Sequence, residues 1–228
     1  MNFNNIKKAV YSLYLTNLYG IKLKYTPKPS DKKKLRYTYS KKLLKSLNIK
    51  VRVKNPSEIP EGSQYLLICN HRSVIDPPIL ELALGNTDIF GLWVSKKELY
   101  NSFFFGMFVR NAGCILLDRE KSQMGGFFAD IKKGVAEGSS IFIFPEGTRN
   151  QTKSRLGTFK DGSRIIAMKN RIPILPINIE TNADIIMKEA LIDSSIEREI
   201  IVNFGEVLPY KSRDNLEEKY KEIFDIVE

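Results

Sequence analysis

Seven short runs of β-forming residues follow one another between residues 49 and 207, and segments with helical periodicity fill several of the gaps. The runs cover residues 49–53, 65–69, 90–94, 114–117, 140–144, 172–178 and 200–207. The helical patterns cover about residues 77–84, 96–110, 121–137, 159–169 and 213–226. Strands that alternate with helices predict an α/β domain, here residues 49–228, whose mixed, largely parallel sheet is flanked by helices. Pro173 and Pro176 predict an edge or irregular strand for the sixth run.

Positive charge is concentrated before this domain. Residues 1–50 contain 13 Lys or Arg and a single acidic residue, Asp31. Residues 51–228 contain 23 basic and 25 acidic residues, so the net charge of +10 belongs to the N-terminal segment. Such asymmetry predicts an anionic partner surface, either lipid or nucleic acid.

The first 48 residues predict a basic amphipathic helical hairpin. Apolar residues recur at three- and four-residue steps from Ile6 to Leu18, and a second helical pattern covers about residues 32–47. Two prolines within residues 25–31 separate the two patterns. Lysines beside an apolar face are typical of helices that lie on an anionic membrane surface. A hairpin that packs on its own domain is the alternative, and nucleic-acid binding is not expected because no reader motif is present.

The cysteines and the hydropathy constrain the compartment. Cys69 and Cys114 both lie in apolar runs, which predicts buried, reduced thiols and a cytosol-facing protein. No stretch approaches the roughly 20 apolar residues that span a bilayer, and the N-terminus lacks the apolar core of a signal peptide. We therefore expect a peripheral or monotopic protein at the cytoplasmic face of the cell membrane.

Polar residues follow three of the predicted strands directly. They are Asn70 and His71 after the second run, Asp118 and Arg119 after the fourth, and Glu146 after the fifth. Sites in α/β sheets gather in the loops beyond the carboxyl ends of the strands. We expect these clusters to converge on one edge of the sheet.

His71 is the only histidine of the chain, and Asp76 follows it by five residues. Histidine accepts protons near neutral pH, and a neighbouring carboxylate can orient its ring. Five residues rotate about 140° along a helix, so a pair at this spacing requires a turn. A simpler interpretation makes Asp76 the N-cap of a helix that begins at Pro77 and His71 a surface loop residue.

Four segments, in order and suitably spaced over about residues 65–180, carry a family resemblance. They read NHRSVIDP at 70–77, GCILLDR at 113–119, FPEGTR at 144–149 and IPILPI at 172–177. They resemble the signature blocks of the glycerolipid acyltransferases, specifically the bacterial 1-acylglycerol-3-phosphate acyltransferases. The first and third blocks are specific, whereas the second and fourth would mean little alone. The second block often has Phe-Ile where this chain has Leu116 and Leu117, a conservative change.

The resemblance implies transfer of an acyl group from acyl-CoA or acyl carrier protein to the sn-2 hydroxyl of lysophosphatidate, giving phosphatidate. His71 would be the general base, oriented by Asp76, and attack would be direct, without an acyl-enzyme. Cys69 as an acylated nucleophile is the alternative. No metal or other cofactor is expected, because no ligand cluster accompanies the single histidine.

The resemblance also implies a set of substrate-binding residues. Arg119 and Arg149 are candidates for the acceptor phosphate, because guanidinium groups bind phosphate bidentately. The alternative is structural ion pairs, Arg119 with Asp118 or Glu120 and Arg149 with Glu146. The remaining predicted contacts are Asn70, Arg72, Ser73, Glu146, Gly147 and Thr148, with Gly147 offering an unhindered N–H.

Three rival functions remain open at this stage. The same chemistry serves other acceptors, such as glycerol 3-phosphate or another lysolipid. A thioesterase would use His71 to activate water. A non-catalytic lipid- or nucleic-acid-binding protein would use only the basic segment.

Overall fold

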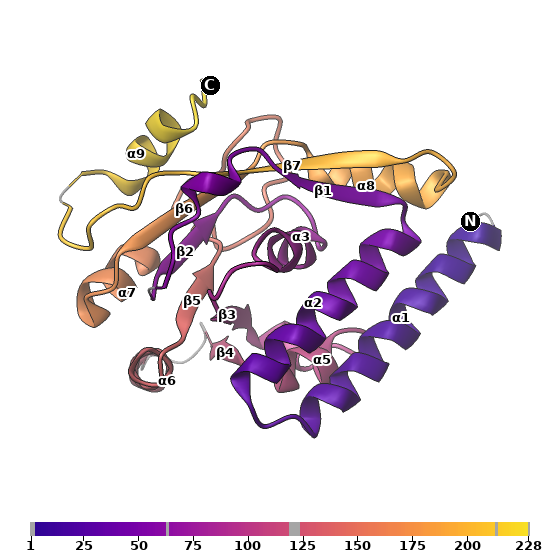
Figure 1. Cartoon of the computed structure of the whole chain (residues 1–228), viewed down its shortest axis with the longest axis horizontal. Coiled ribbons are helices and arrows are strands. Elements are labelled where there is room, and N and C mark those ends of the chain that lie inside the picture. Colours follow the sequence, from indigo (N-terminus) through magenta and orange to yellow (C-terminus); the bar gives the residue numbers. More distant parts are fainter. Residues whose placement is uncertain (1–2, 63, 119–123, 213, 228) are drawn as a thin grey trace.

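A seven-stranded sheet forms the centre of the molecule (Figure 1). The computed structural model describes residues 3–62, 64–118, 124–212 and 214–227. The strands are β1 (Ile49–Val53), β2 (Leu66–Cys69), β3 (Gly91–Lys96), β4 (Cys114–Leu117), β5 (Ser140–Ile143), β6 (Ile174–Ile179) and β7 (Arg198–Phe204), in the order β1-β7-β6-β2-β5-β3-β4. Only the β6–β7 pair is antiparallel. The predicted mixed, largely parallel sheet is confirmed.

Helices cover both faces of the sheet (Figure 1). One face is covered by α2 (Pro29–Ser46), α3 (Asp76–Ala83) and α8 (Ala183–Ile192), and the other by α6 (Gly125–Ala136), α7 (Gly162–Asn170) and α9 (Leu216–Ile223). The remaining helices are α1 (Phe3–Lys24), α4 (Lys97–Tyr100), α5 (Gly106–Asn111) and the short 3₁₀ helix η1 (Pro56–Glu58). This three-layer arrangement accounts for the strongly apolar central strands, which are buried on both faces.

Strand β2 shows how the core places the following loop. Leu67 and Cys69 face the helices α2, α3 and α8, whereas Leu66 and Ile68 face α6, α7 and α9. All four side chains are buried, and each large one contributes on the order of 2 kcal/mol through burial. A one-residue slip would exchange the two faces, so the position at which residue 70 leaves the sheet is firmly fixed.

The predicted helical hairpin is confirmed, and it packs on the α/β domain. Helix α2 contacts α3 and β1, and α1 contacts α2 and α5. The Nζ of Lys8 donates to the Ala190 and Leu191 carbonyl oxygens at 2.9 and 3.0 Å, and the Nζ of Lys32 donates to Asn111 O at 2.9 Å. Within the described residues, no helix combines the length and apolar character needed to cross a bilayer.

Two helical expectations were incomplete. The predicted helix at 96–110 is divided into α4, which ends at Tyr100, and α5. Between them the Ser102 hydroxyl accepts the backbone N–H groups of Phe104 and Phe105. Helix α8 was not predicted. Its signal was Asn182, which acts as the N-cap by accepting the N–H of Ile185 at 3.3 Å.

The expectation that β6 is an edge or irregular strand was wrong, since it lies between β7 and β2. Its prolines are tolerated for a positional reason. The carbonyl of Pro176 accepts the N–H of Gly205, so the nitrogen of Pro176 also faces the β7 side. The paired residues of the β6–β7 ladder begin only at Ile177, and the missing donor therefore breaks no ladder bond.

Candidate active site

The loop after β2 brings His71 and Asp76 together. The Nδ1 atom of His71 lies 2.8 Å from Oδ2 of Asp76. The same oxygen accepts the backbone N–H groups of Arg72 and Ser73 at 2.7 and 2.8 Å. An ionised carboxylate can only accept, so this network places the ring proton on Nδ1. The Nε2 lone pair of His71 is left available for a substrate proton.

Asp76 is not a helix N-cap, contrary to the simpler interpretation of the sequence. Helix α3 begins at Asp76, its N-cap residue is Ile75, and no side chain caps it. The Asp76 carboxylate instead faces back into the turn, where it is only 1% exposed. Its second oxygen, Oδ1, is buried without a hydrogen-bond partner in the described part of the chain. The carboxylate is therefore committed to the turn that presents His71.

The face of the His71 ring lies on Phe144. The two ring centroids are 3.9 Å apart and the planes differ by 9°. The ring has a hydrogen bond at its Nδ1 edge and an aromatic contact on one face, yet His71 is still 18% exposed. Sequence reasoning assigned no role to Phe144, although its place beside Glu146 at the end of a strand was a usable signal.

Glu146 links the loop after β5 to the loop after β2. Its Oε1 accepts the backbone N–H of His71 at 2.7 Å, and its Oε2 accepts that of Gly157 at 2.9 Å. Burial raises the pKa of Glu146 to about 7, although the two N–H groups and Arg72 act in the opposite direction. Both oxygens are occupied by backbone donors, so the alternative of an ion pair with Arg149 was wrong.

Residues 147–149 form the exposed side of the site. Gly147 has a φ of 71°, which favours glycine, and its N–H donates to Phe144 O at 2.9 Å. The expected unhindered N–H is thus used within the turn. Thr148 and Arg149 are exposed. Among the described residues Arg149 has no hydrogen-bond or ion-pair partner, which leaves its guanidinium accessible to an anion.

The other predicted contacts are engaged with protein groups. The Asn70 side chain bridges β2 to β6, because it donates to Ile179 O at 3.0 Å and accepts Ile179 N–H at 2.8 Å. Ser73 is fully buried, and the guanidinium of Arg72 donates to Ser154 O. These contacts support the loop, and direct substrate contact by these three residues stays a prediction.

The predicted convergence on one edge is confirmed for the described residues, because β2, β5, β3 and β4 are parallel neighbours whose carboxyl ends share one edge of the sheet. The carboxyl ends of β2 and β5 are adjacent, and the Glu146 carboxylate connects the loops that follow them by accepting the backbone N–H of His71. Strand β3 lies between β5 and β4, so the β4 cluster is one strand farther away. Its Arg119 lies outside the described residues.

Neither cysteine is placed for nucleophilic chemistry. Cys69 is 2% exposed, its Sγ donates to Asn70 Oδ1, and burial raises the pKa of its thiol well above the usual value. The thiolate is the nucleophilic form, so this environment disfavours an acyl-enzyme at Cys69. Cys114 is free and only partly buried, whereas the sequence predicted full burial.

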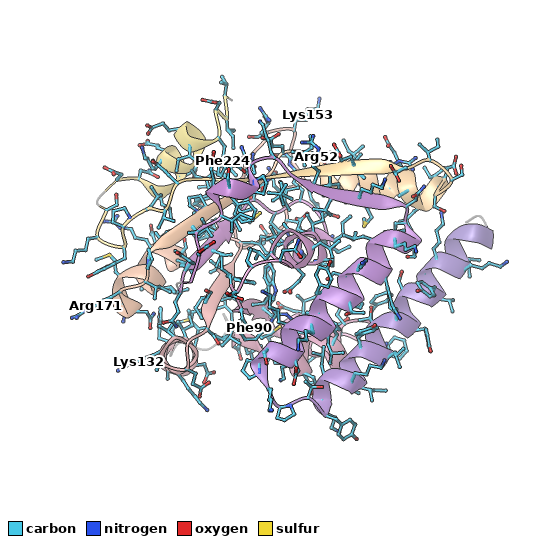
Figure 2. All side chains as sticks on the ribbon, in the orientation of Figure 1. Arg52, Phe90, Lys132, Lys153, Arg171 and Phe224 are labelled. Carbon is cyan, nitrogen blue, oxygen red and sulfur yellow. The ribbon has the colours of Figure 1, made fainter. Side chains whose placement is uncertain are left out.

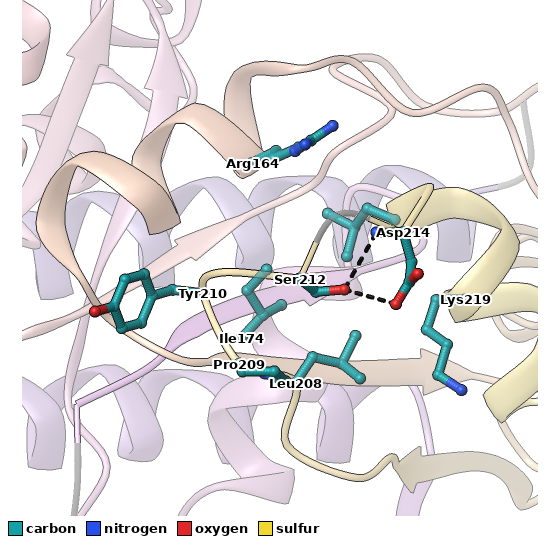
Figure 3. A pocket seen from close by; sticks show the side chains of 9 residues that line it. Arg164, Ile174, Leu208, Pro209, Tyr210, Ser212, Asp214 and Lys219 are labelled. Atoms are coloured by element: carbon teal, nitrogen blue, oxygen red, sulfur yellow. Dashed lines mark hydrogen bonds between the residues drawn. The ribbon is translucent and has the colours of Figure 1, made fainter.

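The described residues contain no cluster of three or more His, Cys, Asp or Glu suited to a metal ion. A small pocket lies between α7, β6 and α9, with Arg164 among its lining residues, and the Ser212 hydroxyl there donates to Asp214 (Figure 3). Its volume of about 10 Å³ accommodates roughly one water molecule.

Comparison with known proteins places these features in context. Residues 50–180 match the Acyltransferase family. A 1-acyl-sn-glycerol-3-phosphate acyltransferase of Helicobacter pylori is 35% identical over 113 residues, which cover 49% of this chain and 46% of the relative. A protein of the same description from Bacillus subtilis is 29% identical over 135 residues, covering 59% and 65%. A probable 1-acyl-sn-glycerol-3-phosphate acyltransferase of Mycoplasma pneumoniae is 31% identical over 136 residues, covering 58% and 49%.

The fold also has a solved counterpart. The structure is similar to the crystal structure of the 1-acyl-sn-glycerophosphate (LPA) acyltransferase PlsC from Thermotoga maritima, with a TM-score of 0.69. The two share 20% sequence identity, and the match covers 98% of this chain and 92% of that one. The chain spans about half the length of the first two curated relatives.

Proposed function

Because the chain belongs to the Acyltransferase family, we propose that it transfers a fatty acyl group from a thioester to the sn-2 hydroxyl of lysophosphatidate, giving phosphatidate. The observation that carries the proposal is the His71–Asp76 pair with its available Nε2 atom. The relatives described as 1-acyl-sn-glycerol-3-phosphate acyltransferases support lysophosphatidate as the acceptor. Acyl-CoA and acyl carrier protein are the proposed donors.

The proposed mechanism uses His71 twice. Its Nε2 accepts the sn-2 hydroxyl proton as the oxygen attacks the thioester carbonyl carbon. When the tetrahedral intermediate collapses, the C–S bond breaks and the imidazolium returns the proton to the departing thiolate. Asp76 stabilises the imidazolium and holds the tautomer throughout. The products are the ester and a free thiol, and no residue becomes acylated.

Arg149 is the proposed phosphate contact within the described residues, and Arg119 is the second candidate. An exposed guanidinium without a protein partner can present two parallel N–H groups to a phosphate. Glu146 holds the backbone of the base and of Gly157, so its proposed role is to shape the loop rather than to touch the acceptor.

The proposed membrane contact is the hairpin of residues 1–48 on an anionic lipid surface at the cytoplasmic face. Val10, Tyr14 and Ile21 are spaced along one side of α1, and Tyr25 follows its last residue; the four side chains are 59, 61, 48 and 75% exposed. Exposed lysines on the hairpin, including Lys41, supply the positive charge. Apolar side chains that enter the headgroup region beside lysines that meet anionic lipid would hold the site near its acceptor.

One assay tests the reaction. Purified protein is given acyl-CoA or acyl carrier protein, with lysophosphatidate, with glycerol 3-phosphate or without acceptor, and thiol release and lipid products are measured. We expect thiol release that depends on lysophosphatidate and yields phosphatidate. Thiol release without acceptor would instead indicate a thioesterase, and transfer only to glycerol 3-phosphate would reassign the acceptor.

A further inference from the structure

We propose that Arg36, a hairpin residue, is a positioning residue for His71. It acts through three side chains in series, which are the buried Glu81 and Trp93 and the partly buried Phe144. The inference rests on the proposed function, because it concerns the ring that acts as the base. It gives the hairpin a role in the active site that is separate from membrane contact.

The series begins with an ion pair between the hairpin and α3. Arg36 is 2% exposed, and its Nη2 lies 2.9 Å from Oε1 of Glu81. Its Nη1 donates to Gly91 O and Ala112 O at 2.8 and 3.2 Å, and the guanidinium lies 4.9 Å from the ring centre of Phe90. Phe90 lies beside α2 (Figure 2). A planar fork is needed to serve this many partners at once, which lysine cannot do.

The second contact orients an indole ring. Oε1 of Glu81 also accepts the Nε1–H of Trp93 at 2.8 Å. Glu81 is 8% exposed and Trp93 7%, so water does not compete freely for this bond. The carboxylate thus joins α2, α3 and β3 at one point.

The third and fourth contacts are aromatic. The Trp93 and Phe144 rings have centroids 5.3 Å apart and planes 29° apart. The ring of Phe144 in turn lies on that of His71, with 3.9 Å between the two ring centroids. The imidazole is therefore the outer member of a three-ring stack whose inner member is held by Glu81.

Of the two supports of the His71 ring, Phe144 is connected to Glu81 by contacts through Trp93, and Asp76 shares helix α3 with it. The bond to Asp76 fixes one edge of the imidazole, and Phe144 fixes its plane. Together they determine where Nε2 points, and a misplacement of about 1 Å can cost roughly 100-fold in rate.

The decisive variant is Trp93→Phe, which keeps an aromatic ring and deletes the N–H donor. Because the chain has one histidine, isotope-labelled histidine gives a single imidazole spectrum in the full-length protein. That spectrum senses the ring current of Phe144. We expect the imidazole resonances to shift and kcat to fall about tenfold, with the KM for lysophosphatidate unchanged.

Arg36→Met and Glu81→Gln test the start of the series. Arg36→Met should shift the same resonances and lower kcat, whereas Glu81→Gln keeps an acceptor for Trp93 and should have the smaller effect. Tyr39→Phe is the matched control, because it removes a buried hairpin hydrogen bond of 3.0 Å to Thr16 that lies outside the series. It should leave both the resonances and kcat unchanged.

The outcomes separate the two proposals. Unchanged imidazole resonances in folded Trp93→Phe protein would overturn the positioning role, and so would an equal shift in Tyr39→Phe. If Arg36→Met does not fold, Trp93→Phe still decides. Absence of acyl transfer by the wild-type protein would refute the proposed function, while the imidazole spectra would still show whether the series holds His71.

Discussion

The carboxyl ends of β2 and β5 and the N-terminal hairpin are both rich in charge, but the charge is used differently. Asp76 is 1% and Glu146 4% exposed, and each accepts at least two backbone N–H groups or ring donors. On the hairpin, Lys34 has an exposed side chain (80%), and Lys41 is exposed as well. A buried charge with fixed partners specifies geometry, whereas an exposed one supplies attraction that salt can screen.

Arg36 is the instructive exception, because it lies on the hairpin but behaves like the active-site charges. It is as buried as Asp76 and has several fixed partners. Lys32 and Lys33 are intermediate, since burial lowers the pKa of each and their ammonium groups bond to carbonyls of the domain. Burial, rather than position in the sequence, therefore separates the two kinds of charge.

The largest expected effect comes from removing the base. His71→Gln should lower kcat by about 10³-fold, because general acid–base catalysis contributes 10²–10⁴. The midpoint of thermal unfolding should change little, since the ring lies partly exposed at the edge of the core. Acyl transfer and thermal unfolding are measured together.

Val74→Ala is the matched control for this change, because Val74 is in the same turn and is 40% exposed. It should leave kcat unchanged. Near-normal transfer by His71→Gln would show that His71 is not the base. The buried charges around it would then have no catalytic role that sets them apart from the exposed charges of the hairpin.

The second effect is a pH dependence of stability at Glu146. Its pKa is raised from 4.5 to about 7, so the folded protein holds a proton on Glu146 that the unfolded chain loses more easily. The resulting contribution to the free energy of unfolding is fully present below pH 4.5 and is lost as pH rises to about 7. Relative to Glu146→Gln, the free energy of unfolding should fall by up to about 3 kcal/mol across this window and then level off. Urea unfolding of both proteins between pH 4.5 and 8 measures it, and parallel profiles would show that Glu146 does not titrate in this range.

The sequence predicted the sheet because strand burial is a local signal. All seven runs became strands, and the break before α2 was read from its prolines. The end of β2 could be located for the same reason, which placed His71 at the carboxyl edge. Helix α8 escaped prediction although Asn182 marked its start, and the interior place of β6 depended on pairing that no single strand encodes.

The site was predictable as a set of residues but not as a set of bonds. The His71–Asp76 pair was expected from chemistry, and the structure brings the two side chains together. The partners of Glu146 could not be foreseen, since they are backbone N–H groups brought close by tertiary packing. The same holds for the series from Arg36 to Phe144, whose members come from four elements or loops with no shared pattern.

Arg149 tests the exposed side of the active site, with an effect smaller than those of the buried carboxylate and the base. Arg149→Ala should raise the KM for lysophosphatidate about 30-fold and leave kcat nearly unchanged, because a charged hydrogen bond to phosphate contributes about 2 kcal/mol. Lys153→Ala removes an exposed charge from the same loop and serves as the control. Equal effects of the two changes would mean that the loop attracts the acceptor by charge alone.

The smallest effect is expected at a single exposed lysine of the hairpin. Lys41→Gln should weaken binding to anionic vesicles about fivefold, because one lysine near such a surface contributes about 1 kcal/mol. The loss should shrink in high salt, and kcat on detergent-dispersed substrate should not change. Lys132→Gln is the control, since Lys132 lies on α6, across the sheet from the hairpin (Figure 2). If both variants lose the same affinity, the membrane senses the net charge of the whole chain. If only Lys41→Gln loses affinity, the hairpin combines two functions, with exposed lysines that attract lipid and a buried arginine that holds the active site.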